Sequence, residues 1–254
     1  MNYTSFISCV LTMIEVELRR LRRDPIEVFT RAIQPVLRVT IFGSVMAKIR
    51  AFPSVGDYVT FIAPGVIMQS ATFIALAYGI MLIFEREAGL LKRLLTVPIS
   101  RAAIVLGRSL AGGIRASTQY IVVLIAAIIA GAKIDLNPLG LIIGWLMTIY
   151  VAMGFTGLSI FVASTLKTRE RFMGIVGAIS MPLFFASNAL YPVDIMPGFI
   201  KIIAPGNPLT YTVNILRKIL IYDNYNILVN LAALTAFNAL SITVAFRCFS
   251  KIVE

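Results

Sequence analysis

The chain has 254 residues, of which 59% are hydrophobic and 14% charged, and its formal net charge is +11. Soluble domains are about half apolar and a quarter charged, so this composition indicates an integral membrane protein rather than a soluble enzyme. No nucleic-acid partner is expected, because the basic residues cluster at the ends of apolar runs, and no metal site is expected, because the chain has no histidine and only two cysteines, far apart.

Residues 3–23 are expected to form an amphipathic helix that lies in the membrane interface. Glu15, Glu17 and the arginines are expected on its polar face, and a loosely ordered basic tail is the alternative. Asp24 and Pro25 break this helix before the next apolar run. The apolar residues that recur at helical spacing are Phe6, Ile7, Val10, Leu11, Ile14, Leu18 and Leu21.

Six apolar segments follow, each reaching the roughly 20 residues that a bilayer requires. They cover residues 26–47, 58–84, 103–131, 139–165, 172–191 and 225–247. Lysine and arginine are more frequent on one side of these spans, which is therefore expected to be cytoplasmic. The sequence predicts one all-α transmembrane domain over residues 1–254, multi-pass in the cell membrane, with both termini in the cytoplasm. Glycines on three spans are expected to mark close helix packing: Gly112, Gly113, Gly154, Gly157, Gly174 and Gly177.

Residues 85–101 lie between the second and third spans, on the side expected to be cytoplasmic. Paired charges, a leucine face and a proline stop are not needed in a solvated turn, but they suit a surface that docks onto a partner. The candidate docking residues are Glu85, Arg86, Glu87, Gly89, Leu91, Arg93, Leu94, Leu95, Pro98 and Arg101.

Polar residues inside the predicted spans are candidates for a transport pathway: Arg38, Gln69, Arg115 and Gln119. Arg38 and Arg115 lie deep enough that we expect them to face the bundle interior, a water-filled path or a partner subunit. Arginines nearer the span ends are expected to snorkel to the headgroups. No carboxylate falls near the middle of a predicted span, which argues against an ion-coupled carrier and against a membrane hydrolase.

Residues 188–224 contain too many prolines for one continuous span and too many apolar residues for a solvated loop. Two short helices that dip into the outer leaflet, at about 196–203 and 208–220, fit this pattern. Irregular backbone is tolerated at that depth only when it is buried in protein or lines a cavity. This re-entrant region, 192–220, is predicted to close the outer end of a pathway, and an interfacial structural cap is the alternative.

The run from Met181 to Pro197, and the run from Asn207 to Tyr211 followed by Arg217, resemble the signature of type-2 ABC exporter permeases of the drug and glycolipid branch. Residues 85–101 resemble the cytoplasmic coupling motif of that family: mixed charges, a glycine, a leucine pair and a Pro-hydrophobic-Ser-Arg ending. Leu90, Lys92 and Asn188 depart from the family pattern, which affects side-chain contacts at the coupling segment and the outer gate. The candidate outer-gate residues are Asn188, Tyr191, Pro192, Pro197, Asn207, Pro208 and Tyr211.

The resemblance implies the membrane-spanning permease subunit of an ATP-driven exporter, coupled to a separate ATPase through residues 85–101. The chain has no G-x-x-x-x-G-K-[ST] loop, so ATP and magnesium are expected on the ATPase and no cofactor on this chain. Two ATPase copies and a second permease copy, as a homodimer among membrane lipids, are the implied assembly. The expected substrate is a drug-like amphiphile or a lipid. The alternatives are a polysaccharide or a lipid-linked saccharide and, in a different class of function, a stand-alone channel or a structural membrane protein.

Overall fold

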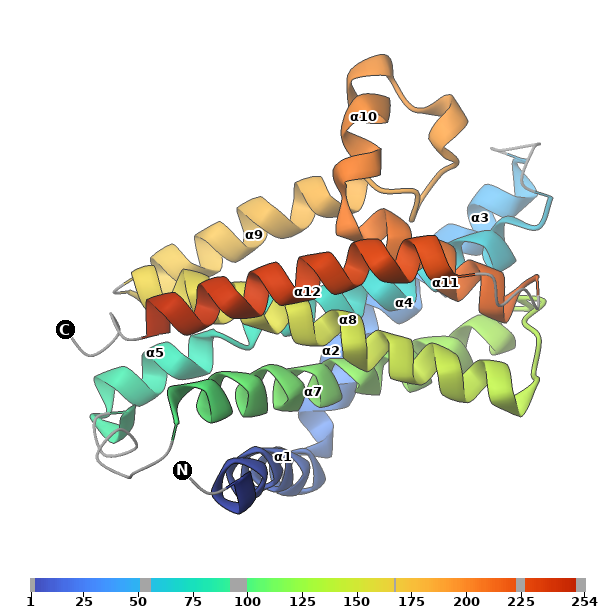
Figure 1. Ribbon diagram of the computed structural model, residues 1–254. Helices are drawn as coiled ribbons and strands as arrows, with labels where there is room; N and C mark the ends of the chain where they lie inside the picture. The colour runs from blue at the N-terminus through green and yellow to red at the C-terminus, as the bar shows by residue number, and fades with distance from the viewer. Residues whose placement is uncertain (1–2, 51–55, 92–99, 167, 223–226, 250–254) are drawn as a thin grey trace.

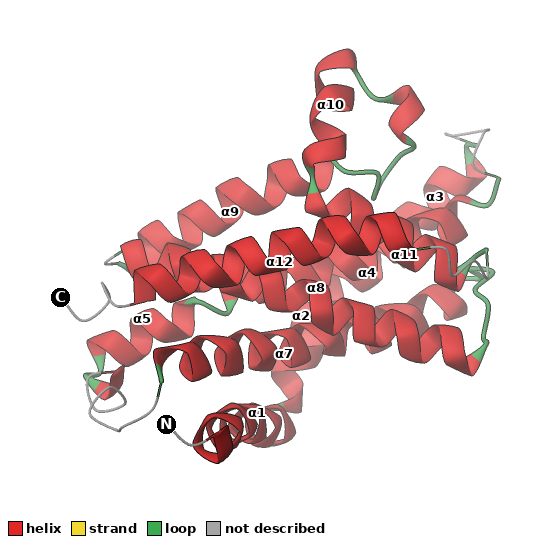
Figure 2. Ribbon diagram, in the orientation of Figure 1, coloured by secondary structure: helices red, strands yellow, loops and turns green. Residues whose placement is uncertain are grey.

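The computed structural model describes all residues except 1–2, 51–55, 92–99, 167, 223–226 and 250–254. Within the described part, every regular element is helical (Figures 1 and 2). The all-α prediction is therefore confirmed.

Four stretches of the described chain are long and apolar enough to cross a membrane. They are Tyr58–Glu87, which comprises α4 (Tyr58–Ala77) and α5 (Ile80–Glu87), then α7 (Arg101–Ile129), α8 (Pro138–Thr165) and α12 (Leu228–Phe249). Each of the first three begins at a side chain that accepts a backbone N–H, as N-caps do: Asp57, Ser100 and Asn137. Their apolar length and their caps together explain why these helices form where they were predicted.

The other two predicted spans form helices of a different kind. Residues 25–48 are divided into α2 (Pro25–Leu37), a π-helical turn η1 (Arg38–Phe42) and α3 (Gly43–Lys48). Pro35 removes one backbone donor just before the π-helical turn, and such turns are frequent at functional sites. α9 (Arg169–Phe185) has 17 residues and ends before residue 191, where the predicted span ended. These two segments do not meet the length and composition of a span, so the described residues contain four candidate spans and the six predicted spans are not confirmed.

Helix α1 (Tyr3–Arg23) lies across the bundle and is seen nearly end-on below α7 in Figure 1. It packs on α7 at Gly107, where an added Cβ would lie 3.1 Å from Met13. The face against the body includes Cys9 and Glu17, whereas Ile7, Leu11 and Leu18 are at least half exposed. The prediction that Glu17 lies on the polar outer face is therefore wrong.

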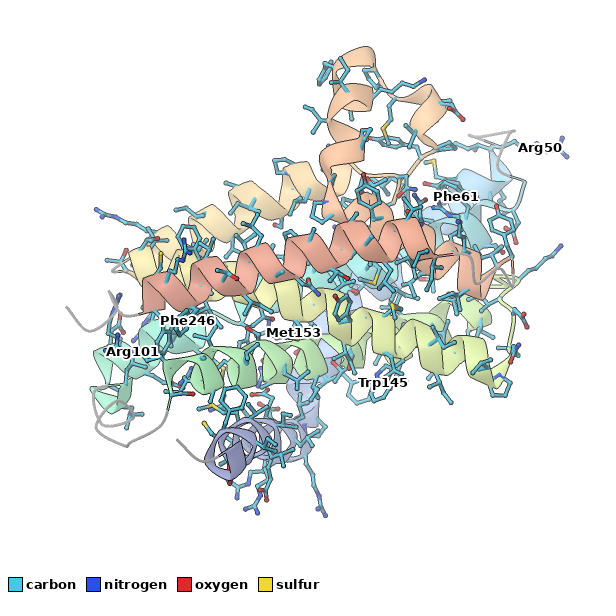
Figure 3. All side chains as sticks on the ribbon, viewed as in Figure 1. Arg50, Phe61, Arg101, Trp145, Met153 and Phe246 are labelled. Carbon is cyan, nitrogen blue, oxygen red and sulfur yellow. The ribbon has the colours of Figure 1, made fainter. Side chains whose placement is uncertain are left out.

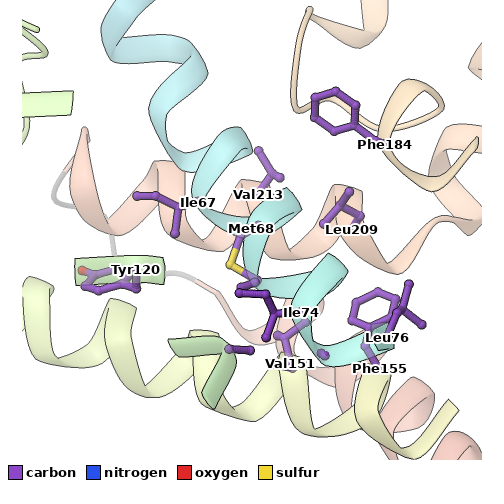
Figure 4. Close-up of a cluster of buried hydrophobic side chains, with 14 of the residues drawn as sticks. Ile67, Met68, Ile74, Leu76, Tyr120, Val151, Phe155, Phe184, Leu209 and Val213 are labelled. Carbon is purple, nitrogen blue, oxygen red and sulfur yellow. The ribbon is translucent and has the colours of Figure 1, made fainter. Parts of the chain in front are cut away.

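The core lies where α4, α7 and α8 meet, and most of α4 is buried. Figure 4 shows part of it, with Met68 of α4 and Val151 and Phe155 of α8 among the buried side chains. Gly112 lies against Thr156, and Gly113 against the carbonyl of Ile149, so the predicted close approach of α7 and α8 is confirmed. On α9, by contrast, a Cβ on Gly174 or Gly177 would meet nothing within 4 Å among the described residues, so close packing at these two glycines is not confirmed.

Large apolar side chains also cover the outside of the bundle. Trp145 on α8 and Phe246 on α12, both labelled in Figure 3, are 36% and 44% exposed. Together with the apolar composition, this outer surface suits a lipid environment.

The segment after α9 forms short helices: η3 (Val193–Ile195), α10 (Gly198–Ile203), η4 (Ala204–Gly206) and α11 (Pro208–Leu220). α10 stands away from the bundle at the top of Figure 1, and its apolar residues Phe199, Ile202 and Ile203 are exposed. α11 instead packs among α4, α8 and α12.

Candidate functional site

A groove runs between α2–η1, α4 and α9. Its inner part is a cavity of about 220 Å³, and its outer part is an open hollow of about 560 Å³. Gln34 lines both, so the two parts share a wall. The inner part is lined by Thr30, Arg31, Gln34, Pro35, Gln69, Ser70, Thr72, Phe73, Ile74, Ser180, Met181, Leu183 and Leu209. The outer part is lined by Gln34, Leu37, Arg38, Ile41, Phe42, Val45, Phe184, Phe185 and Leu190. We call the two parts together the substrate groove, after the role that we propose for it under Proposed function.

Arg38 joins the three walls of the substrate groove. It begins the π-helical turn, its Nη1 donates a hydrogen bond to Gln69 Oε1 on α4, and its guanidinium lies 4.9 Å from the ring centroid of Phe184 on α9. No described carboxylate lies within 4 Å of Arg38. Its positive charge is therefore stabilised by the side-chain amide of Gln69 and the ring face of Phe184. This mixed lining, apolar with a few polar groups, is typical of small-molecule sites.

The other two predicted pathway residues lie elsewhere. Arg115 of α7 donates to Glu17 of α1 and, over 2.8 Å, to Glu27 of α2. The Tyr78 hydroxyl donates to the second oxygen of Glu17 over 3.2 Å, and Gln119 donates to the carbonyl of Val28. Arg115 and Gln119 therefore tie α7 to α1 and α2. Glu17 belongs to α1, outside the predicted spans, but it is buried beside an arginine in the middle of α7.

At the end of the molecule where α5 and α8 end and α9 begins, charged residues tie three segments together (Figure 1). Glu85 pairs with Arg108 of α7, and Glu87 pairs with Arg169 of α9. We call these two pairs the ionic clamp. Arg86 donates to the carbonyl of Leu166 over 2.7 Å, and Arg169 also lies 3.7 Å from the ring centroid of Phe84.

Some of the predicted docking residues lie in or beside the ionic clamp, and the others lie outside the described residues or at the start of α7. Glu85, Arg86 and Glu87 have partners within the chain, Gly89 has a φ of +70° just after α5, and Leu91 is buried. Arg101 is exposed at the start of α7. Arg93, Leu94, Leu95 and Pro98 lie outside the described residues, as does Lys92.

The predicted outer-gate residues mostly anchor the chain between α9 and α11. Asn207 caps α11 through Leu209 N and donates to the carbonyl of Leu183 on α9. Asn188 donates to Asn214, and its own carbonyl accepts a hydrogen bond from Arg217 over 3.1 Å. Hydroxyl groups make further bonds to backbone carbonyls: Tyr191 to Phe185 and Tyr211 to Pro205. Pro208 is the first residue of α11, whereas Pro192 and Pro197 lie in the connections around η3.

Comparison with known proteins identifies the family to which this chain belongs. The profile of the ABC-2 type transporter family matches residues 8–221, which include the substrate groove, the ionic clamp and α11. The chain belongs to the ABC-2 type transporter family. As an ABC-2 permease it is a transport subunit, and it works with an ATPase subunit.

Several relatives of this permease are transport proteins of similar length. It is 31% identical over 216 residues to a putative transport permease, ycf38, of Cyanophora paradoxa, covering 84% of this chain and 74% of that protein. It is 24% identical over 218 residues to the daunorubicin resistance ABC transporter permease DrrB1 of Streptomyces coeruleorubidus, covering 84% and 75%. A probable doxorubicin resistance permease, DrrC, of Mycobacterium tuberculosis is 27% identical over 221 residues, covering 84% and 76%.

The structure brings some of the predicted polar residues of the permease together and reveals partners that the sequence missed. Arg38 and Gln69 meet in the substrate groove, and their role in a pathway stays a prediction. Glu17 and Glu27 were missed as partners of Arg115, although Cys9, Val10, Met13 and Glu17 recur at helical spacing and predict one shared face. Arg169 was missed as a partner of Glu87, and no local sequence pattern signals a pair that is 82 residues apart.

Proposed function

We propose that this permease exports a drug-like amphiphile or a lipid, which passes through the substrate groove while a partner ATPase supplies the energy. The observation that carries the proposal is the groove itself, in which Arg38 and Gln69 face an otherwise largely apolar lining between three helices. Such a lining suits a molecule with both apolar and polar parts. The printed names of two relatives, resistance permeases for daunorubicin and doxorubicin, support a substrate of this kind.

The proposed topology has six spans in the cell membrane. α2 through α3 would serve as the first span and α9 as the fifth, with α10 and α11 as the re-entrant region at the outer end. The distribution of lysine and arginine supports a cytoplasmic location for the ionic clamp and both termini. The π-helical turn and the short α9 would then both border the pathway.

Residues 85–101 are proposed to dock onto the ATPase, and the clamp to carry its motion to α9. The assembly would contain two ATPase copies, which bind ATP and magnesium, and two copies of this chain. Exposed apolar residues on α2, η1 and α9 support a second copy at these faces: Ile33, Leu37, Ile41, Met173, Met181 and Phe185.

Two other functions make different predictions. An exporter of a polysaccharide or a lipid-linked saccharide needs room for a sugar chain, and the inner cavity of about 220 Å³ favours a smaller molecule. A stand-alone channel or a structural protein needs no ATPase.

The test is transport into inverted membrane vesicles that contain the permease with its ATPase. We expect a fluorescent amphiphile to accumulate with ATP, but not with a non-hydrolysable analogue. Vesicles with the permease alone are the control. Equal uptake without ATPase or ATP would identify a channel and contradict the proposal.

A further inference from the structure

Three arginines line a second cavity, of about 160 Å³, where α1, α2 and α7 meet the junction of α4 and α5. Its lining includes Arg20, Arg31 and Arg115, together with Glu27, Tyr78 and Met81. We call Arg20, Arg31 and Arg115 the arginine corner. Their guanidinium groups face the carboxylates of Glu17 and Glu27, so one positive charge remains without a counter-charge.

Two of these guanidinium groups have donors without good acceptors. The side chain of Arg115 is only 10% exposed, and its Nη2 is buried with no hydrogen-bond partner among the described residues. Arg20 Nη1 lies 3.0 Å from the thioether sulfur of Met81 and 3.7 Å from Glu17, and neither contact is a strong hydrogen bond. A buried, unsatisfied guanidinium in a site with excess positive charge is what an anion would satisfy.

The arginine corner adjoins the substrate groove. Arg31 and Ile74 line both the corner cavity and the inner cavity of the groove. Beyond Arg31 the inner part of the groove offers apolar surface from Pro35, Phe73 and Met181, and the next positive charge, Arg38, lies in its outer part. A molecule with an anionic head and an apolar tail therefore matches the two cavities in order.

We propose that the arginine corner binds the anionic, phosphate-type headgroup of an amphiphile whose apolar part lies in the substrate groove. Basic pockets between membrane helices bind lipid headgroups in the same way. That this amphiphile is also the exported molecule rests on the proposed function, but its binding does not.

The test compares probes on the full-length permease in phosphatidylcholine nanodiscs, with binding measured by thermophoresis and empty nanodiscs as the blank. Dodecyl phosphate should bind more tightly than dodecyltrimethylammonium, which has the same tail and the opposite charge. It should also bind more tightly than inorganic phosphate, which has no tail. Equal binding of the two dodecyl compounds would overturn the anionic headgroup, and equally tight binding of inorganic phosphate would overturn the amphiphile.

Variants locate the site. Arg20→Gln and Arg31→Gln should each weaken dodecyl phosphate binding about tenfold, as expected for the loss of one charged hydrogen bond. Arg19→Gln is the matched control, because it removes the same charge from α1, the helix that carries Arg20. The side chain of Arg19 is 70% exposed and lies outside the cavity. Unchanged binding in both corner variants, or an equal loss in Arg19→Gln, would overturn the proposal.

The binding measurement is independent of protein stability and of transport. Arg20 has a side chain that is 43% exposed, so Arg20→Gln should keep the thermal unfolding temperature of the native permease. No ATPase is needed for the measurement. A permease that binds dodecyl phosphate at the arginine corner but exports nothing would contradict the proposed function and leave this inference standing.

Discussion

At the scale of single residues, Glu17 has a large structural role that the neighbouring sequence does not indicate. It lies in a helix with polar and apolar residues on several sides, and its position alone does not reveal a partner 98 residues away. Once Arg115 is buried in α7, however, its charge needs a counter-charge, because an unpaired charge inside a protein is very costly. Glu17 supplies it and thereby fixes how α1 docks.

Replacing Glu17 with alanine should destabilise the permease by about 3 kcal/mol, since removing one partner of a buried ion pair leaves the other uncompensated. Thermal unfolding of the purified protein measures the effect. Glu15→Ala is the control, because the Glu15–Arg19 pair is exposed and contributes little. Equal unfolding temperatures for the two variants would show that Glu17 does not hold α1.

Arg38 is the residue for which we predict a direct effect on substrate. Arg38→Gln removes the charge that contacts Gln69 and Phe184, and should lower the apparent affinity for substrate about tenfold in substrate-stimulated ATP hydrolysis. Lys48→Gln makes the same charge change at an exposed position of α3 that lines neither part of the groove. Equal affinities in these two variants would remove Arg38 from the substrate site.

At the scale of elements, long apolar runs were enough to predict α4, α7, α8 and α12. The short helices α10 and α11 were also predictable, because Pro197 and Pro208 directly precede or begin them. The π-helical turn and the early end of α9 could not be predicted from the sequence. The run through residue 191 remains apolar, and the turn at Ser187 and Asn188 depends on bonds to distant residues such as Asn214 and Arg217.

The turn after α9 also depends on Gly65. A Cβ at this position of α4 would lie 2.3 Å from the carbonyl oxygen of Ala189 and 2.7 Å from its Cα, so backbone must move. Gly65→Ala should destabilise the permease by about 1–3 kcal/mol, as overpacking does.

Gly198→Ala is the matched control for Gly65→Ala, because a Cβ there meets nothing within 4 Å among the described residues. Thermal unfolding compares the two variants. If Gly65→Ala is as stable as Gly198→Ala, then α4 and the turn at Ala189 are not packed closely.

At the scale of the whole molecule, α9 connects the ionic clamp to the substrate groove. Arg169 near its start pairs with Glu87, and Ser180, Met181, Leu183 and Phe184 toward its other end line the groove. A helix of 17 residues is about 25 Å long, so α9 reaches from the clamp to the groove. The sequence predicted a coupling segment but not this route, because the residues that form it are far apart in the chain.

We therefore expect Glu87→Arg and Arg169→Glu to weaken the link between ATP hydrolysis and export. Both side chains are about 40% exposed, so stability should change little. The double variant restores opposite charges across the same contact. It should regain part of the coupling, although it loses the stacking of Arg169 on Phe84.

The most direct test is the number of amphiphile molecules exported per ATP hydrolysed, in vesicles that contain the permease and its ATPase. We predict that each single variant hydrolyses ATP but exports fewer molecules per ATP than the native protein, and that the double variant exports more per ATP than either. Native export ratios in both single variants would contradict the account.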